Sequence, residues 1–180
     1  MLIQLLIHQP RMIGSIVQHT PNWVWMLLAA LLVLGASQCV PRRASQARTV
    51  LLPAAMTVFA LFGLVSAFAG PAQWIAAAAL WLLCALACTA LALWLRPQAP
   101  AAARFDRASG QFELPGSVLP LLMIVGIFLV KYLVGVELAL QPALSTDPAF
   151  ALGVAALYGA FNGVFAARAL RLWRLRLAAA

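Results

Sequence analysis

The sequence predicts an all-α integral membrane protein, a polytopic bundle of five transmembrane helices. Of its 180 residues, 65% are hydrophobic and 9% are charged, whereas soluble domains are typically about 45–50% apolar and about 25% charged. This composition also excludes a disordered chain, which would be poor in apolar residues. Five apolar runs approach or exceed the roughly 20 residues that a helix needs to cross the hydrocarbon of a bilayer. They are residues 22–40, 50–69, 72–95, 117–140 and 148–170.

Charged or helix-breaking residues bound the runs. Arg42 and Arg43 follow the first run, and Gly70 with Pro71 separates the second from the third. Asp147 and Pro148 open the fifth run as an N-cap followed by proline in the first turn. The predicted organisation is an N-terminal interfacial segment, residues 1–21, and a five-helix membrane domain, residues 22–177. Met12 is a candidate alternative start within the first segment.

The positions of the basic residues predict the orientation. The chain has 12 basic and 4 acidic residues, for a net charge of +8. Arg11 alone lies on one side of the predicted membrane, and Lys131 lies within the fourth run. By the positive-inside rule, the side with most arginines is cytoplasmic and the N-terminus is outside. Arginine also follows the first run instead of preceding it, the reverse of a cleavable signal. The ten cytoplasmic arginines are Arg42, Arg43, Arg48, Arg96, Arg104, Arg107, Arg168, Arg171, Arg174 and Arg176.

Three stretches together resemble a family of small, uncharacterised bacterial inner-membrane proteins. They are residues 19–25 (HTPNWVW), 112–117 (FELPGS) and 128–132 (FLVKY). The resemblance covers roughly residues 12–173 and departs from the family at the first eleven residues, which look like an extension. It implies a five-helix protein of the bacterial inner membrane. It supplies no substrate, cofactor or assigned site.

Lys131 is the most informative single residue, because a lysine near the centre of a membrane helix costs about 2.5–3.5 kcal/mol on insertion scales and usually faces protein or water. If the fourth and fifth runs form an antiparallel hairpin that turns around residues 144–145, Lys131 lies level with Tyr158. Asn162 lies one turn deeper on the same face as Tyr158. Glu137 is about 120° around the helix from Lys131, a poor geometry for a direct pair. We therefore predict a polar intramembrane site of Lys131, Tyr158, Asn162 and Glu137, either a structural pin or an ion, proton or anionic-ligand site.

Small residues repeat every fourth position in the fifth run, which lets another helix approach closely. This stripe predicts packing within the chain or, alternatively, a homodimer seam. It consists of Ala155, Gly159, Gly163 and Ala167.

The run ends in a basic amphipathic segment, which we expect to contact anionic lipid head groups at the cytoplasmic face. Its contact residues are Arg168, Arg171, Arg174 and Arg176. Nucleic-acid binding is disfavoured, because no soluble basic fold accompanies these arginines.

The longest loop, residues 96–116, predicts a small cytoplasmic hairpin with Phe105 opposite Phe112 and Arg104 opposite Glu113. Two strands alone are marginal in water, so this hairpin must lean on the helices, as a structural lid, or on a partner.

Metal and cofactor sites are not predicted. Cys84 and Cys88 share a helix face and could in principle hold a soft metal, but no histidine or methionine joins them on the same segment, so packing is the favoured interpretation. For His8 and His19, which precede the first run, an interfacial or helix-capping role is favoured over a ligand role.

The leading functional hypothesis is a non-enzymatic accessory, assembly or interaction protein, because the sequence lacks catalytic motifs and paired intramembrane carboxylates. Its partners would be the bilayer with its anionic head groups and a homo-oligomer or another membrane protein. The alternative is a small-solute or ion permease that uses Lys131, Tyr158 and Asn162. A third hypothesis is a cofactor-binding membrane subunit that uses His19 or the face of Cys84 and Cys88.

Overall fold

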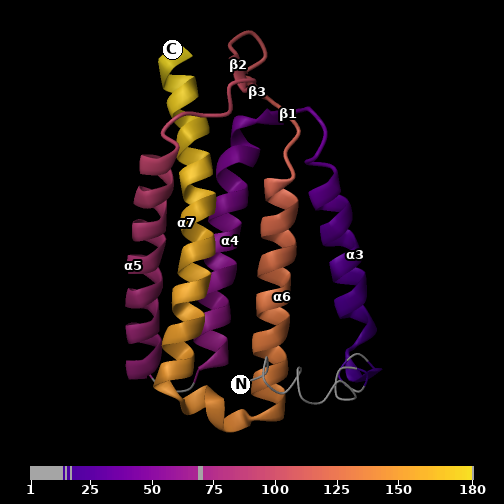
Figure 1. Cartoon of the computed structure of the whole chain (residues 1–180), viewed down its shortest axis with the longest axis vertical. Coiled ribbons are helices and arrows are strands. Elements are labelled where there is room, and N and C mark those ends of the chain that lie inside the picture. Colours follow the sequence, from indigo (N-terminus) through magenta and orange to yellow (C-terminus); the bar gives the residue numbers. More distant parts are fainter. Residues whose placement is uncertain (1–13, 15, 17, 69–70, 180) are drawn as a thin grey trace.

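A computed structural model of the chain describes residues 14, 16, 18–68 and 71–179. Five α-helices in the described part run lengthwise beside one another, and a small sheet lies at one end (Figure 1). The helices are α3 (Asn22–Ala36), α4 (Gln46–Ala67), α5 (Pro71–Leu95), α6 (Leu119–Leu140) and α7 (Pro148–Ala179). The predicted interfacial segment, residues 1–21, lies largely outside the described residues, as does His8.

Three of these helices are long and apolar enough to cross a membrane: Gln73–Leu95, Leu119–Leu140 and Pro148–Ala178. The first predicted run is wrong at its C-terminal end. Helix α3 stops at Ala36 after 15 residues, which is about 22 Å at 1.5 Å per residue. Its last carbonyls are satisfied by a turn, in which the Ser37 and Gln38 amides donate to Val33 and Gly35. Helix α4 begins four residues earlier than predicted, and α7 continues nine residues beyond the predicted end.

The predicted hairpin is present and belongs to a three-stranded sheet. Strand β2 (Arg104–Asp106) pairs antiparallel with β3 (Gln111–Leu114), with Phe105 opposite Phe112 and Arg104 opposite Glu113, in the predicted register. The sequence analysis missed β1 (Arg42–Ser45), which connects α3 to α4 and pairs with the other edge of β3. We call this end of the bundle the sheet end. All ten arginines assigned to one side of the membrane fall on the segments gathered there.

The sheet packs against the last helix, α7. Phe112 is completely buried and packs in a cluster with Leu114 of β3, Ala44 of β1 and Leu172 of α7. Strand β1 is further held by the ion pair between Arg43 and Glu113, whose charged atoms lie 2.9 Å apart. The helices therefore supply the apolar support that an isolated hairpin lacks.

A second cluster forms the core of the bundle and joins α4, α5 and α7. Its largest members are Leu64 of α4, Phe68 directly after α4, Trp81 of α5 and Tyr158 of α7. The connection between α6 and α7 is a short 3₁₀ helix, η1 (Pro142–Thr146), so α6 and α7 form an antiparallel hairpin that turns where the sequence predicts.

Candidate functional site

The small-residue stripe of α7 lies against α5. Ala155 and Ala167 are completely buried. A Cβ built on Gly159 would collide with the Trp81 carbonyl oxygen and lie 2.9 Å from the Cys84 Cβ. On Gly163, it would lie 2.7 Å from the Cys88 Cβ. The stripe thus faces a neighbour within the chain, and the face of Cys84 and Cys88 packs against the two glycines.

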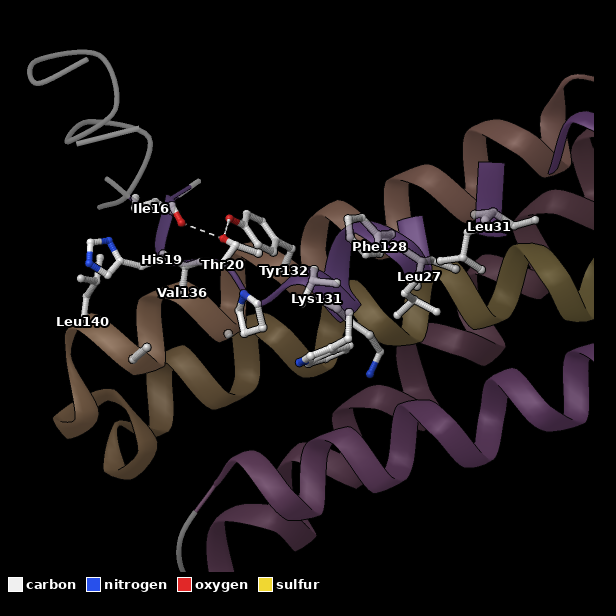
Figure 2. Close-up of a pocket in the computed structure, with 17 residues that line it drawn as sticks. Ile16, His19, Thr20, Leu27, Leu31, Phe128, Lys131, Tyr132, Val136 and Leu140 are labelled. Carbon is white, nitrogen blue, oxygen red and sulfur yellow. Dashed lines mark hydrogen bonds between the residues drawn. The ribbon is translucent and has the colours of Figure 1, made fainter. Parts of the chain in front are cut away.

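Lys131 belongs to α6, and its side chain lies close to α4 and α7. Its side chain reaches from α6 toward α4, where a Cβ built on Gly63 would lie 2.7 Å from the ammonium nitrogen (Figure 2). The ammonium also lies 4.8 Å from the centroid of the Tyr158 ring, within the range of a cation–π interaction. Lys131 and Tyr158 are therefore level, as the hairpin geometry predicts, and the contact of Tyr158 with Lys131 is made by the face of its ring.

Asn162 lines the same small cavity as Lys131, and its side chain makes two hydrogen bonds. Its amide nitrogen donates to the Tyr158 carbonyl oxygen at 2.9 Å, and its side-chain oxygen accepts from the Thr57 hydroxyl at 3.3 Å. Thr57 thus joins α4 to this group, a contribution that sequence analysis missed because no spacing rule relates α4 to α7. Glu137 lies six residues farther along α6 and lines neither of the two cavities that Lys131 lines.

The cavity between Lys131, Tyr158 and Asn162 is small. Its volume is about 20 Å³, and its other walls are apolar side chains, among them Ile127 and Phe161. About 10–15 Å³ suffices for one water molecule, so the space admits about one. It has the size of a hydration site.

A much larger cavity of about 940 Å³ lies on the other side of Lys131, between α3 and α6. We call it the α3/α6 groove. Its walls are mainly aliphatic and aromatic, and the part of α6 that lines it extends from Ile124 to Leu140, about 24 Å along the helix axis. His19 and Thr20 line the groove toward its Leu140 end, and Leu31 lies toward the other end (Figure 2).

Tyr132 lines the α3/α6 groove and contacts Thr20 there. Its hydroxyl oxygen lies 2.7 Å from that of Thr20, which in turn donates to the Ile16 carbonyl oxygen at 2.7 Å. The Tyr132 ring also stacks on Phe128, with ring centroids 6.2 Å apart. Thr20 and Tyr132 belong to two separate sequence motifs, residues 19–25 and 128–132, and the sequence alone did not predict their contact.

The four predicted head-group arginines of α7 are placed differently from one another. Arg168 lines a cavity together with Arg42, while Arg171 donates to the Ala92 carbonyl oxygen near the end of α5. The Arg176 guanidinium lies 4.6 Å from the centroid of the Trp173 ring. Arg174 is exposed. The segment is thus partly used for packing and capping within the bundle.

Metal ligands do not gather anywhere in the described part of the chain: no group of three histidine, cysteine or acidic side chains could hold an ion there. The described residues that line the α3/α6 groove include one histidine, His19, and no cysteine or acid.

The family of the chain follows from a comparison of its whole length. A family described as "Family of unknown function (DUF6622)" matches residues 1–180. The chain belongs to this family. The match includes the first eleven residues, which the sequence analysis treats as an extension. No curated protein and no solved structure matches the chain.

The three motif stretches quoted for the resemblance lie at contacts between elements. Thr20 and Tyr132 join the first stretch to the third. In the second, the Ser117 amide donates to the Gln38 carbonyl oxygen at 3.0 Å, and a Cβ on Gly116 would collide with the Cys39 carbonyl oxygen. In this chain, therefore, each of the three stretches contributes to holding α3 in place.

Proposed function

We propose that this chain is a multi-pass protein of the bacterial inner membrane that crosses the bilayer five times, with its N-terminus outside and its C-terminus in the cytoplasm. Three helices that meet the length and hydropathy of a span support this placement. The basic sheet end supports the orientation, because positively charged loops are retained on the cytoplasmic side.

We further propose that it acts without catalysis, as an accessory or assembly protein that binds another membrane protein. The observation that carries this proposal is the contact of the Lys131 ammonium with α4 and α7, on the inner side of the α3/α6 groove that this residue also lines. The ammonium lies against Gly63 and the Tyr158 ring, beside a cavity of about 20 Å³. A path for ions or solutes needs a continuous polar cavity, whereas this one admits about one water molecule.

The α3/α6 groove is the surface on which we expect the partner, a transmembrane helix of another protein, to dock. Gly135 and Ala139 line the groove four residues apart and are both exposed. A Cβ built on Gly135 would meet nothing within 4 Å. Two small residues at this spacing let a second helix approach closely, and close packing drives helix association in lipid.

Co-purification of the full chain in mild detergent tests this proposal. Gly135→Leu should fill the space that a docking helix would use and release the partner. Gly153→Leu is the matched control, because Gly153 is also exposed on a long helix with nothing within 4 Å of its Cβ position. Retention of the partner by both variants would contradict the docking surface. Recovery of a second copy of the chain would identify the partner as a homo-oligomer.

The alternative, a small-solute or ion permease, is favoured by one fact: Lys131 lines both the groove and the small polar cavity. Flux into reconstituted vesicles separates the two functions. Loss of a measured flux on Lys131→Met, with the same amount of folded protein inserted, would establish transport and refute the accessory function. We expect no such flux from the wild-type chain or the variant.

A further inference from the structure

A third cavity, of about 430 Å³, lies at the sheet end where α3, β1, α4, α6 and α7 meet. Three arginines line it: Arg42, Arg43 and Arg168. The charge of Arg43 is compensated by its ion pair with Glu113. No acidic side chain is among the described residues that line this cavity.

Arg42 is held in place by a buried polar group. Its guanidinium donates at 2.8 Å to the side-chain oxygen of Gln38, which is only 5% exposed. Arg42 and the half-buried Arg168 line the same cavity, so two like charges border one space. An anion that binds beside two like charges lowers their mutual repulsion.

The rest of the lining is sorted by depth. At the sheet, the lining includes Gln38 and Thr49 together with the apolar residues Ala44, Leu114 and Leu172, whereas Leu34, Leu51 and Phe165 lie farther from the sheet along their helices and are all apolar. A site with cations at the level of the membrane surface and apolar walls below them matches the division of a phospholipid into head group and acyl chain.

We infer that the cavity between Arg42 and Arg168 is a binding site for a phosphate group, and that the phosphate belongs to an anionic phospholipid whose chain contacts Leu34 and Phe165. Guanidinium groups bind phosphate oxygens through paired, charge-assisted hydrogen bonds. Basic pockets between transmembrane helices on the cytoplasmic side also bind lipid head groups. The inference requires the bundle to lie in a membrane and is independent of the helix-docking surface proposed above.

Binding can be measured on the full chain in an uncharged detergent, from the rise in melting temperature as phosphatidylglycerol, phosphatidylcholine or inorganic phosphate is added. Arg42→Gln/Arg168→Gln removes both charges of the site. Arg104→Gln/Arg107→Gln removes two charges from exposed positions of the hairpin, outside the cavity and outside the predicted head-group arginines, and is the matched control. Arg168→Gln alone, which leaves the Arg42 to Gln38 hydrogen bond in place, serves if the double variant fails to fold.

We expect phosphatidylglycerol to raise the melting temperature of the wild type saturably, and phosphatidylcholine, whose net charge is zero, to act more weakly. The site variant should lose at least about tenfold in affinity for phosphatidylglycerol, and the control should bind as the wild type does. If inorganic phosphate alone gives the same saturable, arginine-dependent shift, the phosphate site stands and its ligand is free phosphate. Equal binding of phosphatidylglycerol to all variants, or equal losses in the site variant and the control, would overturn the inference.

Discussion

The hydroxyl oxygens of Tyr132 and Thr20 lie 2.7 Å apart, although the two residues are 112 positions apart in the chain. This contact joins α6 to the segment that precedes α3, at the end of the bundle opposite the sheet. At the sheet end, α3 is held by the hydrogen bond between Ser117 and Gln38. The α3/α6 groove lies between these two attachments, so its width depends on both.

Loss of the Tyr132 hydroxyl should weaken the attachment of α3. We expect Tyr132→Phe to lower the free energy of unfolding by about 0.5–1.5 kcal/mol, because a hydrogen bond within a membrane bundle contributes about that much. Reversible unfolding in mixed micelles measures the change. In a double-mutant cycle, Thr20→Val should cost less in the Tyr132→Phe background than in the wild type, because only its hydrogen bond to the Ile16 carbonyl remains to be lost there. Fully additive effects would show that the two hydroxyls do not interact.

Enlarging Gly159 should disrupt the contact between α5 and α7. We expect Gly159→Val to cost about 1–3 kcal/mol of unfolding free energy, because the new side chain overlaps the Trp81 backbone, which cannot move aside cheaply. Gly153→Val on the same helix is the control, since it enters open space. Reversible unfolding in mixed micelles again measures the change. Equal losses of unfolding free energy in the two variants would argue against close packing at Gly159.

Gly63 should tolerate a larger side chain only when Lys131 is shortened or uncharged. The Cβ of Gly63→Leu would lie 2.7 Å from the Lys131 ammonium nitrogen, closer than van der Waals contact allows. The substitution should therefore displace the ammonium from the Tyr158 ring and lower the melting temperature. The double variant Gly63→Leu/Lys131→Met should recover part of that loss, because a buried charge then no longer needs a partner. A double variant as unstable as the sum of the two single variants would contradict this coupling.

The hairpin turn contains a carboxyl group whose titration can be followed. The Ser109 hydroxyl donates to Asp106 at 2.5 Å and, with the Ala108 amide, lowers the pKa of Asp106 below its usual value of 3.8. A lowered pKa means that ionised Asp106 stabilises the turn above about pH 4, and that this contribution disappears as the pH falls through the lowered pKa.

Carboxyl chemical shifts of Asp106 measured against pH test this prediction. Ser109→Ala should move the pKa of Asp106 up toward its usual value, because it removes the largest of the interactions that lower it. Ser66→Ala, on α4, is a control for the loss of an exposed hydroxyl. An unchanged pKa in Ser109→Ala would show that the hydrogen bond does not hold the turn in solution.

The features best predicted from the sequence rest on simple counting. The level of Lys131 with Tyr158 follows from the position of one turn and the equal rise of two helices, and the pairing of Phe105 with Phe112 follows from strand periodicity. Strand β1 was missed because the stretch from Arg42 to Ser45 has no alternating apolar pattern and becomes a strand only by pairing with β3.

The groove and its closure by Thr20 and Tyr132 could not be read from the sequence for a different reason. Helices that are apolar on all sides carry little periodic signal to indicate which face meets a neighbour. The hydrogen bond between Thr57 and Asn162 was missed because the sequence of α4 does not indicate which of its faces meets α7. Antiparallel neighbours joined by a short turn, such as α6 and α7, are the exception, because the connection itself sets their depth.

The sheet also has a consequence for biogenesis. Arg43 and Glu113 are 70 residues apart, so the ribosome must add β3 long after it has released β1. At about 5–20 residues per second, the delay is roughly 4–14 s. In the five-span topology proposed above, α3 and α4 wait in the bilayer during that interval with β1 unpaired, and this is the stage at which a chaperone or insertase would help the nascent chain most.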